Sequence, residues 1–133
     1  MRMSAAALLT AVAVSFPLPA FAIAGSAQTW ILREVDGRPA VAEAQTIMRL
    51  SDNRITGSGG CNFYTGVGSI ADGRVSVGLL LMTKMGCAPD VLEQEARFAS
   101  ALPSSVRYEI DGGGAMRLFD ARGRMTMRLT PTR

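Results

Sequence analysis

The sequence contains no histidine and a single lysine, Lys84, among its 133 residues. Histidine is the commonest general base near neutral pH and the commonest metal ligand, so its absence removes the usual route to acid–base catalysis and to zinc binding. No other residue pattern indicates a catalytic set, a metal site or a cofactor. We therefore expect a protein that is not an enzyme.

Clustered positive charge is also missing. The formal net charge is +3, and the basic residues, almost all of them arginine, are scattered along the chain. A nucleic-acid-binding domain concentrates such residues on one face or along one segment. The scatter predicts an ordinary solvated surface and no nucleic-acid partner.

Cysteine is scarce, with only Cys61 and Cys87 present. Redox pairs usually have C-x-x-C spacing, which these two lack, and zinc sites need more ligands. In an oxidising compartment we expect a Cys61–Cys87 disulfide, which would stabilise the fold by ~3–4 kcal/mol on the chain-entropy model. Sequence alone does not bring the two sulfurs together, so two separate buried thiols remain the alternative.

The first 22 residues have the pattern of a cleaved secretory signal peptide. Arg2 gives a positive start, an apolar run covers residues 5–16, and Ala20-Phe21-Ala22 reads as an A-x-A cleavage site. A membrane anchor would need about 20 apolar residues, and prolines interrupt this run early. Residues 23–133 then form one domain. Because no cysteine lies near the cleavage point, we expect a periplasmic protein without a lipid anchor.

The first half of the domain reads as a series of short strands. Strand signals cover residues 29–35, 46–51, 54–57, 62–70 and 75–77. Turn residues separate them at Asp36-Gly37-Arg38-Pro39, Asp52-Asn53 and Asp72-Gly73. Gly66 and Gly68 lie inside the fourth strand and indicate a bulge or a bend.

The last third alternates strictly between apolar and polar residues, which is typical of antiparallel sheet with one buried face. The buried positions are predicted to be Val106, Tyr108, Ile110, Met116, Leu118, Met125, Met127 and Leu129. With about eight short strands in all, we expect an α+β, mainly antiparallel domain. Closure of consecutive hairpins protects strand edges, so the strands are predicted to form a partly open barrel with one helix packed against it.

The helix is predicted to open at Ala88-Pro89-Asp90, where Asp90 has capping-box spacing to Glu93, and to stop at Pro103. A mostly apolar stripe follows at helical spacing and would face the core. Its members are Val91, Leu92, Glu95, Phe98, Ala99 and Leu102.

Several short motifs occur in a fixed order along the chain. They are W-x-L at Trp30 and Leu32; Gly57, Gly60, Cys61, Asn62, Tyr64 and Gly66; Thr83, Met85 and Cys87; Glu95, Phe98, Ala101 and Leu102; and Tyr108, Ile110, Met116 and Leu118. This order resembles the META domain family, also described as HslJ-like. Met116 is one departure, because the family more often has leucine there.

The resemblance implies a compact antiparallel β-domain with one helix, similar to lipid-binding secretion pilotins. Its members are mostly envelope proteins, often lipid-anchored, and some are associated with heat shock or stress. No agreed biochemical activity comes with the family. The residues expected in the core are Trp30, Leu32, Phe98, Leu102, Tyr108, Ile110 and Leu118.

Two functional hypotheses follow. The first is a monomeric, non-enzymatic envelope module that binds a protein, a peptide or a lipid through a groove between helix and sheet. The second is a thiol-based redox enzyme or sensor that uses Cys61 and Cys87.

Overall fold

The computed structural model describes residues 27–133, so the predicted signal peptide lies outside it. Within this range the chain forms ten strands and one helix. In chain order they are β1 (Gln28–Val35), β2 (Arg38–Pro39), β3 (Ile47–Ser51), β4 (Arg54–Ser58), β5 (Phe63–Ala71), β6 (Arg74–Val77), β7 (Leu81–Met82), α1 (Pro89–Ser104), β8 (Ser105–Ile110), β9 (Met116–Asp120) and β10 (Met125–Pro131).

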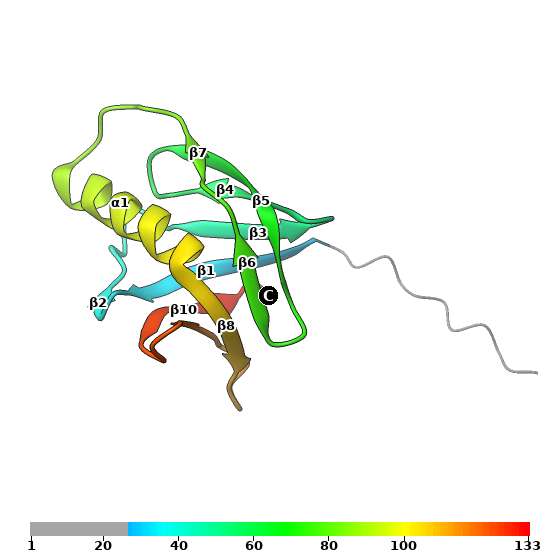
Figure 1. The fold of residues 1–133 in the computed structure, drawn as a ribbon. Helices are drawn as coiled ribbons and strands as arrows, with labels where there is room; N and C mark the ends of the chain where they lie inside the picture. The colour runs from blue at the N-terminus through cyan, green and yellow to red at the C-terminus, as the bar shows by residue number, and fades with distance from the viewer. Residues whose placement is uncertain (1–26) are drawn as a thin grey trace, which may run out of the picture.

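Eight of these strands pair edge to edge in a closed antiparallel barrel (Figure 1). The ring runs β1, β3, β4, β5, β6, β8, β9 and β10, and it closes because β10 pairs with β1. The two shortest strands are additions to the ring: β2 pairs with β1, and β7 pairs with β5. The predicted mainly antiparallel fold with a single helix is confirmed, and closure of the ring gives each of its strands a neighbour on both sides over at least part of its length.

Three hairpins turn on pairs of residues that both have positive φ. The pairs are Asp36–Gly37, Asp52–Asn53 and Asp72–Gly73. Two consecutive positive φ values characterise type I′ turns, whose twist matches that of the flanking strands and which favour Asp, Asn and Gly. These are the dipeptides from which the sequence predicts turns. The first turn is tighter than expected, because Arg38 and Pro39 already pair back onto β1 as β2.

The barrel interior is filled by apolar side chains from its strands together with side chains from the helix. The cluster comprises Trp30, Leu32, Val35, Met48, Ile55, Tyr64, Val75, Val77, Phe98, Ala101, Leu102, Met116, Leu118, Met127 and Leu129. Five of the seven expected core residues belong to it, and Tyr108 packs against it while partly exposed. Phe98 has no exposed surface and its ring centroid lies 5.2 Å from that of Tyr64.

The prediction that Ile110 belongs to the core is wrong, because its side chain is 50% exposed. Val106, predicted to share its buried face, is exposed as well. Val106 lies at a bulge of β8, where the register with β9 shifts between Ser105 and Arg107. For Ile110 the reason is the short seam between β6 and β8, in which Arg74 is paired with Arg107 and the backbone N–H of Tyr108 donates to the oxygen of Gly73. Beyond Tyr108, β8 is paired with β9 alone, so alternation along its sequence does not bury Ile110.

A bulge also alters the last strand. The register between β10 and β9 shifts between Met125 and Met127. As a result Thr126 is buried and Met125 is only partly so, the reverse of the predicted alternation. Leu129, further along the strand, is buried as expected.

The helix α1 begins after Ala88, with Pro89 in its first turn, and runs straight into β8 (Figure 1). The predicted capping box is wrong: Asp90 lies inside the first turn, and the residue before the helix makes no side-chain cap. A proline in the first turn loses no helical hydrogen bond, which explains the start. The helix continues one residue past Pro103. Its buried residues are Val91, Gln94, Glu95, Phe98, Ala101 and Leu102.

Candidate functional site

The glycine-rich loop between β4 and β5 is fastened to the helix by one carboxylate. Oε1 of Glu95 accepts hydrogen bonds from the backbone N–H of Cys61 at 2.7 Å and of Asn62 at 2.5 Å. Oε2 accepts a third from Asn62 Nδ2 at 2.7 Å. Glu95 is buried, and a buried carboxylate is tolerated only when donors surround it. The loop therefore supplies the donors that this helix residue requires.

Asn62 also binds the segment that follows β7. Its Oδ1 accepts hydrogen bonds from Thr83 Oγ1 at 3.0 Å and from the backbone N–H of Met85 at 2.6 Å. Thr83 Oγ1 also accepts the backbone N–H of Phe63 at 3.0 Å. These contacts explain why the G-C-N and T-x-M motifs occur together, since one side chain satisfies both segments.

The predicted disulfide joins the same two segments. Cys61 and Cys87 are bonded, with their Cα atoms 6.3 Å apart, and neither is a free thiol. Cys61 is partly buried and Cys87 is exposed. The disulfide thus ties the loop before β5 to the residues that lead into α1.

A second buried side chain of the helix, Gln94, holds the chain before β3. Its Oε1 accepts the backbone N–H of Val41 at 2.6 Å, and its Nε2 donates to Thr46 Oγ1 at 3.0 Å. Thr46 in turn donates to the backbone oxygen of Gly59 at 2.7 Å. The sequence prediction missed Gln94 and Thr46. The signal available was a polar pair, Gln94 and Glu95, inside the otherwise apolar helix stripe.

Two of the motif glycines, Gly57 and Gly60, are required by backbone packing or by backbone conformation, and a third, Gly66, has a close side-chain neighbour. A Cβ at Gly57 would overlap the backbone oxygen of Ile47, and one at Gly66 would lie 2.6 Å from Cδ2 of Leu80. Gly60 has φ +116°, which side chains rarely adopt. The pairing of β5 with β4 passes regularly through Gly66, so this glycine marks a close approach.

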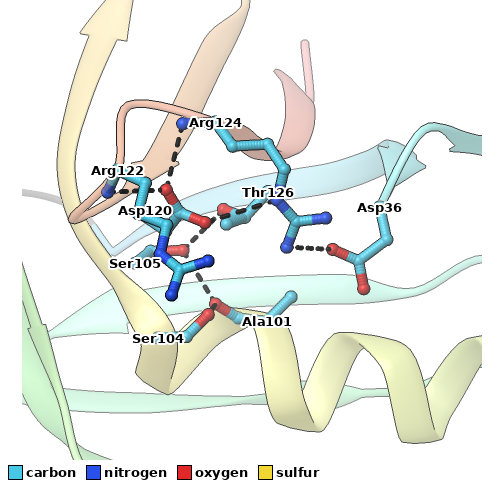
Figure 2. Close-up of polar contacts among 8 residues, drawn as sticks. All are labelled: Asp36, Ala101, Ser104, Ser105, Asp120, Arg122, Arg124 and Thr126. Carbon is cyan, nitrogen blue, oxygen red and sulfur yellow. Dashed lines mark hydrogen bonds and ion pairs between the residues drawn. The ribbon is translucent and has the colours of Figure 1, made fainter.

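At the other end of the helix a polar cluster joins α1, β8 and the β9–β10 turn (Figure 2). Ser105 Oγ donates to the backbone oxygen of Ala101 at 2.8 Å and lies 2.6 Å from Thr126 Oγ1. Asp120 accepts the backbone N–H of Arg124, which holds the pKa of Asp120 below its usual value. The same arginine bridges Asp120 and Asp36 with its guanidinium, at 3.3 and 3.6 Å. The polar groups of this cluster bond to one another, so the cluster has a structural role.

A group of exposed apolar side chains lies on the outside of the barrel, along β5 and around β7. Residues Thr65 and Leu81 are paired, as are Tyr64 and Met82, so the two strands lie side by side. A shallow hollow of about 350 Å³ lies over them, lined by Phe63, Tyr64, Thr65, Leu81, Met82 and Thr83. The large apolar side chains exposed here are Phe63 (62%), Val67 (68%), Leu79 (87%), Leu81 (73%) and Met85 (46%). We call these five residues the apolar surface.

The sequence prediction missed the apolar surface, apart from Met85 as a motif residue. Its signal was present in residues 62–70, where large apolar side chains occur on both faces of one strand: Tyr64 inside, Phe63 and Val67 outside. The run of leucines from Leu79 to Leu81 is a second sign. A groove under the helix is not formed at Phe98 and Leu102, because both are fully buried.

Within residues 27–133, no cluster of three or more Cys, Asp or Glu side chains is placed to hold a metal ion. The single helix of this region is neither long nor apolar enough to span a bilayer. Burial raises the pKa of Tyr64 well above its ordinary value, an effect that nearby Arg49 partly offsets. The Tyr64 hydroxyl donates to the backbone oxygen of Ile47 at 2.8 Å, so the neutral phenol is the form the fold uses.

Comparison with known families and structures agrees with this geometry. The family model of the META domain matches residues 23–132. The chain belongs to the META domain family. No curated protein matches this META domain.

Solved structures show the same fold. An NMR structure of a protein from Burkholderia xenovorans matches with a TM-score of 0.61 at 24% sequence identity, over 79% of this chain and 81% of that chain. A second NMR structure matches with a TM-score of 0.60 at 23% identity, over 77% of this chain and 87% of that chain. At such identities the likeness concerns the fold of the META domain and nothing further.

Proposed function

We propose that this META domain is an exported, monomeric, non-enzymatic binding module of the cell envelope, without a lipid anchor and with a role in envelope stress. The observation that carries the proposal is the apolar surface, Phe63, Val67, Leu79, Leu81 and Met85. Two of these residues, Phe63 and Leu81, line one hollow, and neighbouring exposed apolar side chains mark interaction sites. The ligand class is a protein, a peptide or a lipid.

The residues available for chemistry support a binding role rather than catalysis. Both cysteines are taken up by a disulfide, and the sequence has no histidine. The buried carboxylate of Glu95 accepts three hydrogen bonds from Cys61 and Asn62, so it is engaged in holding the loop in place.

The thiol-based alternative finds no support in the surroundings of Cys61. A reactive cysteine needs positive charge beside it to stabilise the thiolate. The charged group next to Cys61 is instead the carboxylate of Glu95, which accepts its backbone N–H at 2.7 Å. This arrangement disfavours a thiolate.

Photo-crosslinking in the native envelope tests the binding role. A photo-reactive residue at Leu81, the centre of the apolar surface, should give specific adducts with a protein, a peptide or a lipid. The matched control is the same residue at Val106, which is exposed on β8, a strand separated from β5 by β6. Absence of adducts at position 81, or the same adducts at both positions, contradicts the proposal.

Export is tested separately by N-terminal sequencing of protein recovered from the envelope. The mature chain should begin at Ile23, or at Gly25 if cleavage follows Ala24. Recovery of envelope protein that still begins at Met1 would contradict a cleaved signal peptide.

A further inference from the structure

Positively charged side chains lie beside the apolar surface. Val67 is paired with Arg54 across β4 and β5, and Nη1 of Arg54 lies 3.4 Å from Thr65 Oγ1. Opposed residues of neighbouring strands point to the same face of a sheet. The cation of Arg54 therefore lies on the same outer face as the apolar side chains.

Two further cations border this surface. Arg49 is paired with Thr56, which is paired with Thr65, and Thr65 is paired with Leu81. These four residues form one cross-strand row on the outside of the barrel, so Arg49 lies about two strand spacings, roughly 10 Å, from Thr65. Lys84, the single lysine, is exposed and adjoins Met85 in the chain.

Carboxylates are scarce in the same region. Strands β3, β4, β5 and β7 contain no acidic residue. Between residues 46 and 89 the acids are Asp52 and Asp72, and both sit in hairpin turns with positive φ. The outer face of these strands therefore combines protruding apolar side chains with Arg49 and Arg54. The acid nearest to them in the chain is Asp52, in the β3–β4 turn, where it lines a hollow together with Arg54.

The combination of apolar side chains and positive charge favours one class of ligand over the others. A second copy of the chain would bring Arg49, Arg54 and Lys84 close to the same cations of its partner, and like charges repel. The surface is the outside of a barrel with a shallow hollow, whereas peptides that bind by their side chains use deeper pockets. A flat layer with anionic phosphates over an apolar interior complements both the cations and the protruding side chains.

We infer that the apolar surface, flanked by Arg49, Arg54 and Lys84, docks onto an anionic phospholipid bilayer. Phe63, Val67, Leu79, Leu81 and Met85 enter the boundary between headgroups and acyl chains. The three cations bind lipid phosphates. This inference rests on the proposed function, since it names the ligand of the same surface.

The test is binding to phospholipid vesicles by the chain from Ile23 onward, which contains every described strand and the helix. Vesicles of phosphatidylcholine alone are compared with vesicles containing 30 mol% phosphatidylglycerol, a composition set on the order of a biological anionic fraction. We expect binding to the anionic vesicles, weak binding to neutral ones, and weakening by salt.

Two paired variants test the two components of the surface. Leu79→Ser with Leu81→Ser should lower the partition coefficient by at least about tenfold, because two exposed leucines lose their apolar burial. Arg49→Gln with Arg54→Gln should lower it about thirtyfold, from the contribution per arginine near an anionic surface. All four side chains lie on the outer face, and circular dichroism verifies the fold of each variant.

Matched controls carry the same changes elsewhere. Val106→Ser with Ile110→Ser removes exposed apolar side chains from β8, and Arg38→Gln with Arg122→Gln removes equal charge from exposed sites outside the surface. Both controls should bind like the wild type. An equal loss of vesicle binding in the arginine control would show that net charge alone accounts for the effect, and this would overturn the inference.

Other outcomes also decide the matter. Failure to bind anionic vesicles, or binding that survives Leu79→Ser with Leu81→Ser, overturns docking on a bilayer. Sedimentation that shows a dimer dispersed by the same variant identifies a second copy as the occupant instead. Photo-crosslinking at Leu81 separates the two proposals: adducts with protein alone leave the binding module intact and end the bilayer inference, whereas no adducts end both.

Discussion

The carboxylate of Glu95 accepts two hydrogen bonds from Asn62, one from its backbone N–H at 2.5 Å and one from its side-chain amide at 2.7 Å. One helix residue thereby fixes both the path and the side-chain direction of a loop residue 33 positions earlier. Because Asn62 then presents its oxygen to Thr83 and Met85, the helix determines the position of the β7 segment as well. The apolar surface is thus positioned through a buried polar network.

Removing the charge of Glu95 should destabilise the fold. In Glu95→Gln an amide nitrogen replaces one acceptor oxygen, so a buried donor loses its partner. The free energy of unfolding should fall by about 2–3 kcal/mol. Urea denaturation measures the loss. Glu93→Gln on the exposed side of the same helix is the control and should change stability by less than about 0.5 kcal/mol. Equal effects of the two variants would show that the network contributes nothing specific.

Glycine at position 57 is required for strands β3 and β4 to approach each other. Gly57→Ala places a Cβ on the backbone oxygen of Ile47, so we expect a loss of at least about 3 kcal/mol or failure to fold. Gly86→Ala is the matched control, since a Cβ there meets nothing within 4 Å. Thermal unfolding of both variants gives the comparison, and a Gly57→Ala protein as stable as Gly86→Ala would refute the steric argument.

The disulfide should act on stability rather than on activity. Replacing both cysteines by serine, as Cys61→Ser with Cys87→Ser, should lower the free energy of unfolding by ~2–5 kcal/mol, because the unfolded chain loses a constraint. Urea midpoints of wild type and variant, each with and without reductant, measure this. Reductant should lower the wild-type midpoint and leave that of the variant unchanged. A wild-type urea midpoint that is unchanged by reductant would rule out a stabilising disulfide.

Phe98 should be the most sensitive apolar position of the helix. Its side chain is fully buried against Tyr64, so Phe98→Ala should cost about 3–5 kcal/mol. Leu92→Ala changes a side chain on the same helix that is 37% exposed, and it should cost much less. Denaturant titration compares them. A loss below about 1 kcal/mol for Phe98→Ala would mean that the helix does not close the barrel interior.

Alkaline pH should destabilise the fold through Tyr64. Burial raises its pKa in the folded state above the unfolded value near 10. The stabilisation is therefore complete below pH 10 and is lost as the pH rises further, at about 1.4 kcal/mol per pH unit. In Tyr64→Phe this component of the pH dependence should disappear. Urea midpoints of both proteins between pH 8 and 11.5 measure it, and parallel curves would contradict a buried neutral phenol.

The turns and the barrel class could be predicted because they depend on local chemistry. Asp-Gly and Asp-Asn pairs adopt positive φ readily, and the structure turns at each of them. Alternation in β9 also predicts burial correctly, as at Met116 and Leu118. In that strand both neighbours are present, so the sequence period and the burial agree.

Other features depend on contacts between distant segments, which local patterns do not contain. Ile110 alternates as a core residue would, yet β8 lacks a second neighbour there. Glu95 reads as a polar interruption of the helix stripe, although its partners at positions 61 and 62 make it a buried anchor. The exposed apolar residues of β5 and β7 are invisible to a rule that places every apolar side chain inside.

Closure of the barrel joins its first strand to its last, with Trp30 opposite Pro131. A chain that emerges N-terminus first presents β1 long before its partner exists. Pairings between residues so distant in sequence are slow to form, and until β10 arrives the sheet keeps two open edges. A nascent or truncated chain that stops short of β10 is therefore exposed to edge-to-edge aggregation. This exposure ends when the seven-residue strand β10 pairs with β1.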